Sequence, residues 1–175
     1  MLIGWPLIGI PLMVLLGLGV RDGATPIDGF FQQGRGGPLS ALLVLSDERT
    51  AKALLLITLA VALYRRLWPL AVAAVVVPLA AWAATETLKP LFGRLKEQGL
   101  AYPSGHTAVM VVLLGLLIIA VGAKRWIVLA AIVFGVLGIV GQAVSYHYFT
   151  DAVGSALLGT SLVCLAGAAL RRVRL

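Results

Sequence analysis

The stretch Tyr102-Pro103-Ser104-Gly105-His106-Thr107 stands directly before an apolar run from Ala108 to Ala123. Proline does not continue a preceding helix comfortably, whereas serine is a favoured N-cap residue. The stretch therefore predicts a helix that starts at Ser104, with one of the chain's two histidines in its first turn. Ionisable side chains are costly at membrane depth, so a histidine at the edge of an apolar run indicates a functional site.

The rest of the chain has the composition of an integral membrane protein. Apolar residues make up 61% and charged residues 12%, against roughly 45–50% and about 25% in soluble domains. Six stretches approach the length of about 20 residues that a transmembrane helix needs. They are Leu2 to Val20, Ala51 to Leu63, Leu67 to Leu88, Ala108 to Ala123, Trp126 to Val144 and Ala152 to Leu170. We expect an all-α polytopic membrane protein, a six-transmembrane-helix bundle that forms a single membrane-embedded domain over residues 1–175.

Two segments near the N-terminus need separate expectations. The first apolar run lacks a basic start and a clear small-x-small cleavage site, so we expect it to be retained rather than removed as a signal peptide. The longest non-spanning piece, Arg21 to Thr50, mixes apolar and polar residues as interfacial segments do. It predicts one or two short interfacial helices on the outer surface; an ordinary connecting loop is the alternative.

Charge is unevenly divided between the two sets of loops. One set carries only basic residues, namely Arg65, Arg66, Lys124, Arg125, Arg171, Arg172 and Arg174. The other set carries equal numbers of basic and acidic residues. Because short loops rich in Lys and Arg stay in the cytoplasm, we expect both termini to be cytoplasmic and both histidines to face the extracytoplasmic side of the plasma membrane. The net charge of +7 then reflects topology and attraction to anionic membrane lipids, and no nucleic-acid partner is expected.

Several chemically active residues are expected on that same face. His147 precedes Asp151 by four residues, so the carboxylate can accept a hydrogen bond from the imidazole and fix its tautomer. Alternatively, Asp151 only caps the last helix. The first amides after Ser104 form an anion site at a helix N-terminus, and Gly105 lets an anion approach the backbone. Three cations follow the third apolar run, at Lys89, Arg94 and Lys96, and such cations bind either phosphate or lipid headgroups.

These clusters resemble the signature of the type 2 phosphatidic acid phosphatase superfamily of membrane lipid phosphatases. Its second motif, Pro-Ser-Gly-His, is complete at residues 103–106, and the His-x3-Asp half of its third motif matches at His147 and Asp151. The first motif, Lys-x6-Arg-Pro, matches at Lys89, but Lys96-Glu97 stand in place of Arg-Pro. The third motif also has an arginine that falls on Gly141 here. In an active site, Arg94 or Lys96 must then supply the missing charge, with Arg94 expected to make the bidentate phosphate contact; the alternative is that the substrate is held differently.

The resemblance implies a mechanism and a set of roles. His147 is the nucleophile that forms a phosphohistidine, Asp151 orients it, and His106 protonates the leaving oxygen. The phosphate is bound by Lys89, Arg94, Lys96, Ser104 and Gly105. No cofactor and no metal are implied. Two histidines and an aspartate form an alternative divalent metal site, although three nearby cations oppose it.

The sequence predicts a class of substrate and leaves alternatives open. We expect a lipid phosphate or diphosphate: a polyprenyl phosphate or diphosphate, a polyprenyl phosphosugar phosphate, or phosphatidic acid or phosphatidylglycerol phosphate. The abundance of Ala, Val, Leu, Gly and Arg favours a bacterial cell-envelope enzyme. The alternative is a weakly active or inactive member that binds lipid phosphates or a partner. A face of small residues at Gly135, Gly138 and Gly141 favours a homo-oligomer.

Overall fold

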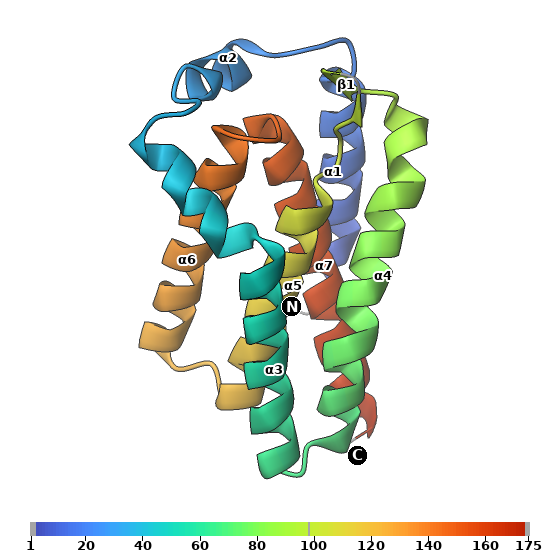
Figure 1. Ribbon diagram of the computed structural model, residues 1–175. Coiled ribbons are helices and arrows are strands. Elements are labelled where there is room, and N and C mark those ends of the chain that lie inside the picture. Colours follow the sequence, from blue (N-terminus) through green and yellow to red (C-terminus); the bar gives the residue numbers. More distant parts are fainter. Residues whose placement is uncertain (1–2, 98, 174–175) are drawn as a thin grey trace.

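The computed structural model describes residues 3–97 and 99–173, and most of them are helical (Figure 1). The helices are α1 (Pro6–Gly19), α2 (Pro26–Gln32), the 3-10 helix η1 (Pro38–Ser46), α3 (Glu48–Tyr64), α4 (Trp68–Phe92), α5 (Gly105–Val121), α6 (Arg125–Ala143) and α7 (Phe149–Val173). Two short strands, β1 (Leu95–Lys96) and β2 (Gly99–Leu100), pair antiparallel between α4 and α5. The all-α prediction is confirmed.

Helix α5 occupies the centre of the bundle. It packs against α3, α4, α6 and α7, while α1 packs against α7. Buried residues occur all around α5, among them Met110, Val112 and Leu113. A helix that is apolar on every side belongs in a core. Because α5 is held on all sides, its first turn is a fixed point on which a site can be built.

Three helices among the described residues are long and apolar enough to cross a membrane, namely α4, α6 and α7. Helices α1 and α5 are apolar but shorter. The chain is therefore a membrane protein, although the length criterion alone does not give six spans. The short apolar run Ala51 to Leu63 is part of a longer helix, because α3 begins upstream at Glu48. Asp47 is the N-cap of α3 and accepts a hydrogen bond from the Thr50 N–H.

The segment between α1 and α3 forms two short helices, as one of the two interpretations predicted. Thr25 and Asp28 cap α2 reciprocally: the Asp28 N–H donates to the Thr25 hydroxyl, and the Thr25 N–H donates to the Asp28 carboxylate. Helix η1 then descends along α6 to the start of α3 (Figure 1).

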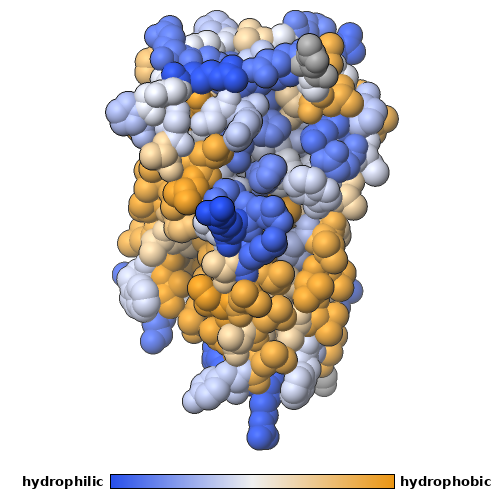
Figure 2. Space-filling model, viewed as in Figure 1, coloured by the Kyte–Doolittle hydropathy of each residue, from blue (hydrophilic) through white to orange (hydrophobic). Residues whose placement is uncertain are grey.

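The two ends of the bundle differ in charge, as the loop analysis predicted. The α3–α4 and α5–α6 turns lie with the end of α7 at the lower end in Figure 1, and these segments carry the purely basic set. Arg174 of that set is outside the described residues. The upper end holds α2 and the strands. Figure 2 shows an apolar belt between hydrophilic ends, interrupted at mid-height by a hydrophilic patch. Exposed Glu48, Arg49 and Lys52 belong to the start of α3, which lies at that height in Figure 1.

Candidate active site

The Pro-Ser-Gly-His stretch begins α5 as predicted. The buried Ser104 hydroxyl caps the helix by accepting hydrogen bonds from the N–H and the hydroxyl of Thr107. A side chain at Gly105 would meet the Trp82 ring at 2.8 Å, so glycine is required here for close packing against α4. His106 is exposed and lies edge-on to Trp82, with ring centroids 5.6 Å apart. It opens into a cleft of about 330 Å³ that is lined by Ser46, Glu48, Ala51, Trp82, His106 and Val109.

His147 and Asp151 approach each other where α7 begins. The His147 Nδ1 is 3.6 Å from the Asp151 Oδ2, which is longer than a hydrogen bond, and Nδ1 has no hydrogen-bond partner among the described residues. That carboxylate oxygen accepts instead from the Tyr148 N–H at 2.9 Å. The predicted bond is therefore not formed, but the two groups face each other at the loose separation common in ligand-free sites. His147 is 14% exposed, which leaves its ring open on one side.

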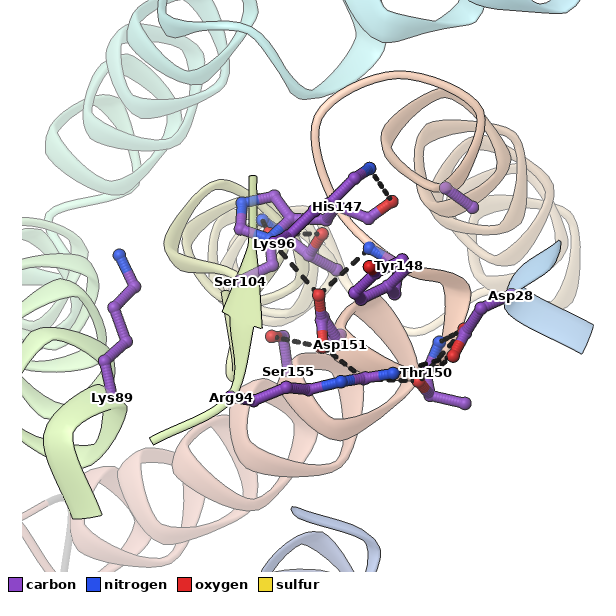
Figure 3. Close-up of polar contacts among 12 residues, drawn as sticks. Asp28, Lys89, Arg94, Lys96, Ser104, His147, Tyr148, Thr150, Asp151 and Ser155 are labelled. Atoms are coloured by element: carbon purple, nitrogen blue, oxygen red, sulfur yellow. Dashed lines mark hydrogen bonds and ion pairs between the residues drawn. The ribbon is translucent and has the colours of Figure 1, made fainter. Parts of the chain in front are cut away.

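Arg94 does not have the position that the sequence predicted. Its side chain is 0% exposed, and its two terminal nitrogens donate four hydrogen bonds. Figure 3 shows Arg94 between Asp28, Thr150 and Asp151. The acceptors are the Asp151 carboxylate at 2.5 Å, the Thr150 hydroxyl at 2.6 Å, the Asp28 carboxylate at 2.7 Å and the Gly23 carbonyl at 2.8 Å. Both terminal nitrogens of the guanidinium are thus occupied inside the protein, whereas its Nε has no hydrogen-bond partner among the described residues. The expectation that Arg94 supplies the missing bidentate phosphate contact is corrected: Arg94 is part of a buried ion network.

The two predicted lysines differ in their surroundings. Lys96 is half-buried, donates to the carbonyls of Ser145 at 3.3 Å and His147 at 3.0 Å, and lies over the Tyr148 ring. Burial and the nearby Arg35 lower the pKa of the Lys96 ammonium, while Asp151 opposes the shift. Lys89 stands apart on the last turns of α4, where it pairs with Glu86 at 2.6 Å (Figure 3). Of the cations expected to bind phosphate, Lys96 is the one next to His147.

Gly141 explains why the third motif has no arginine. A Cβ at this position would collide with the backbone of Leu42 and Leu43 in η1, so α6 and η1 pack too closely for any side chain. A Cβ at Gly138 would likewise collide with the Met110 sulfur of α5. These two glycines of the small-residue face are therefore used for packing within the chain.

Sequence reasoning missed Asp28 and Thr150. Asp28 is fully buried and accepts hydrogen bonds from the Arg94 side chain, the Thr150 N–H and hydroxyl, and Thr25. Burial by itself raises the pKa of the Asp28 carboxyl, but these hydrogen bonds outweigh burial and hold that pKa below its ordinary value. The Thr25-x-x-Asp28 spacing marks a helix start. Asp28 is also an acidic residue among the apolar Ile27, Phe30 and Phe31, and this pattern was a further sign of a buried carboxylate.

Comparison with known proteins agrees with the motif resemblance. No curated protein and no solved structure matched this chain. Residues 81–174 match the sequence model of the PAP2 superfamily. The matched range contains every site residue predicted above, from Lys89 to Asp151, and leaves Asp28 outside. Because it covers more than half of the 175 residues, the chain belongs to the PAP2 superfamily, the family of phosphatases that its motifs predicted.

Proposed function

We propose that the protein is a metal-independent lipid phosphatase that works through a phosphohistidine. Membership of the PAP2 superfamily supports hydrolysis of phosphate esters in general. The observation that carries the specific proposal is the meeting of His147 with the buried Asp151 carboxylate, beside a half-buried lysine. The membrane setting favours a lipid phosphate or diphosphate as substrate, and polyprenyl and glycerolipid phosphates are the candidates.

The residues divide the chemistry between them. The His147 Nε2 attacks phosphorus and forms an N–P bond as the P–O bond to the lipid breaks, and His106 donates a proton to the leaving oxygen. His106 then takes a proton from water, which attacks phosphorus and releases phosphate and free His147. The Lys96 ammonium, with Lys89 and the amides after Ser104, stabilises charge on the phosphoryl oxygens. Asp151 orients the His147 ring.

The same proposal assigns the protein's place in the membrane. Six helices, α1 and α3 to α7, cross the bilayer, with both termini in the cytoplasm and the site at the extracytoplasmic side. The segregation of basic residues to one end of the bundle supports this orientation. The cleft beside His106 opens next to the hydrophilic start of α3, a suitable place for a phosphorylated headgroup.

A second candidate is a non-catalytic lipid-phosphate-binding protein. The packing at Gly141 favours it, because η1 fills the space of the family's phosphate-binding arginine. The retained His106, His147 and Asp151 favour catalysis.

The deciding experiment is phosphate release by purified protein over a panel of lipid phosphates and diphosphates. We expect turnover by the wild type, inhibition by vanadate, and unchanged activity in a chelator. His147→Ala should abolish both turnover and the acid-labile phosphoenzyme, whereas Arg49→Lys, on the same face, should leave both unchanged. Wild-type phosphate release by folded His147→Ala would falsify the catalytic assignment. Activity lost to the chelator and restored by a divalent ion would contradict the metal-independent mechanism.

A further inference from the structure

We infer that Asp28, on the short helix α2, is a positioning residue that acts through Arg94 on the catalytic pair. This inference rests on the proposed function. Asp28 lies outside the region that matches the family and is more than fifty residues from Arg94 in sequence. It nevertheless belongs to the same hydrogen-bonded network as Asp151 (Figure 3).

The network is a chain of buried charges with Arg94 at its centre. One terminal nitrogen of Arg94 donates to Asp28 at 2.7 Å and the other donates to Asp151 at 2.5 Å. All three side chains are 0% exposed. Buried charges persist when they are paired and hydrogen-bonded. Arg94 therefore depends on both carboxylates, and Asp28 shares the charge that Asp151 would otherwise neutralise alone.

Thr150 provides a second link between Asp28 and the segment that carries Asp151. Its hydroxyl lies 3.0 Å from each Asp28 oxygen and accepts from Arg94 at 2.6 Å, and its N–H donates to Asp28 at 2.9 Å. Because Thr150 precedes Asp151 directly, Asp28 fixes the backbone that carries the catalytic carboxylate. The start of α7 is thus bound to α2 by main-chain and side-chain contacts together.

Helix α2 also holds the loop that carries His147. The Gln32 amide donates to the carbonyls of Ala143 at 2.5 Å and His147 at 3.2 Å. The Phe31 ring stacks on Phe149 with centroids 4.5 Å apart. These contacts lie on both sides of His147 in the sequence. One face of α2 therefore packs against the loop that carries His147 and the start of α7, and supports both. This face is formed by Asp28, Phe31 and Gln32.

The consequence for catalysis concerns orientation rather than substrate binding. Asp28 is fully buried, so it does not contact the phosphate. Without its charge, Arg94 would draw the Asp151 carboxylate toward itself and away from the His147 Nδ1, which is already 3.6 Å distant. The ring would then lose the nearest acceptor for an Nδ1 proton, the one whose approach favours the tautomer with Nε2 free to attack. We expect kcat to fall while KM stays nearly constant.

The kinetic test compares Asp28→Asn with Asp22→Asn, the same change at an exposed residue of the same segment. With the lipid that the wild type hydrolyses best, Asp28→Asn should lower kcat by about 10- to 100-fold and change KM by less than about twofold. Asp22→Asn should match the wild type. Thr150→Val keeps every charge and should lower kcat in the same direction, so it carries the test if Asp28→Asn does not fold.

A spectroscopic test separates this inference from the proposed activity. The chain has two histidines, so His106→Gln leaves only His147 for observation with ¹⁵N-labelled histidine. The neutral ring of this parent variant should show one tautomer, protonated at Nδ1. Adding Asp28→Asn or Thr150→Val should give a mixture of tautomers. Unchanged tautomer signals together with wild-type kcat in a folded Asp28→Asn protein overturn the inference. If the wild type hydrolyses no lipid, the proposed function fails and the tautomer signals alone decide.

Discussion

Arg94 and Lys96 are only two residues apart, yet their side chains have different roles. Arg94 is fully buried and bound to two carboxylates, whereas Lys96 is half-buried and donates its hydrogen bonds to backbone carbonyl oxygens. Sequence reasoning expected both cations to bind phosphate. It could not separate them, because the acids that bind Arg94 come from residues 28 and 151, far away in the chain.

Lys96 allows a pH test at the residue scale. The proposed phosphate contact needs its ammonium form, which is present below the pKa in the folded protein and lost as pH rises through it. Because burial lowers that pKa from its ordinary value of 10.5, activity should fall on the alkaline side at a pH below that value. Arginine stays charged beyond about pH 12, so Lys96→Arg should shift the alkaline fall of kcat/KM to higher pH. Lys52→Arg, an exposed lysine paired with Glu48, is the control and should leave the alkaline fall in place. An alkaline fall at the same pH in Lys96→Arg and wild type counts against the contact.

The elements that were predictable are those whose signals are local. The start of α5 follows from Pro103 and Ser104, and the apolar runs locate all six long helices to within a few residues. The course of η1 was not predictable, because its position depends on close packing against Gly141, a contact between distant segments. The candidate site follows the same rule. The motifs point to His106, His147 and Asp151, whereas the buried ion pair of Asp28 with Arg94 exists only in the folded chain.

The packing between η1 and α6 gives a prediction at the element scale. Gly141→Ala places a methyl group against the η1 backbone, whereas Gly135→Ala meets only a Leu114 methyl at 3.7 Å, an ordinary contact. We expect Gly141→Ala to lower stability by about 1–3 kcal/mol. Gly135→Ala should be neutral or stabilising by up to about 1 kcal/mol, since alanine is the better helix former. Thermal unfolding in one detergent compares the two variants.

Restoring the family's arginine provides a second measurement on the same contact. Because η1 occupies the space, Gly141→Arg should destabilise the protein and give no gain in phosphate release. Equal melting temperatures for Gly135→Ala and Gly141→Ala, or a Gly141→Arg protein that releases phosphate faster than the wild type, would show that η1 is free to move aside.

At the scale of the whole molecule, the bundle keeps its basic turns at one end and the candidate site toward the other (Figure 1). The up-and-down order of the helices does not show which end of the bundle faces the extracytoplasmic side. Turning the whole bundle over in the membrane would leave every internal contact unchanged. The direction proposed above rests on the charge difference between the ends, because positively charged short loops tend to be retained in the cytoplasm.

Two matched substitutions test this orientation. Ala24 and Ala123 are both exposed, neutral and in loops, one at each end of the bundle. In a Cys164→Ala background, which removes the chain's one cysteine, Ala24→Cys should react with a membrane-impermeant thiol reagent on sealed cells. Ala123→Cys should react only after the membrane is permeabilised. Because neither change alters a charge, the basic turns that determine orientation stay intact. The reverse labelling pattern would put His106 and His147 on the cytoplasmic side, and the substrate would then be a lipid phosphate of the inner leaflet.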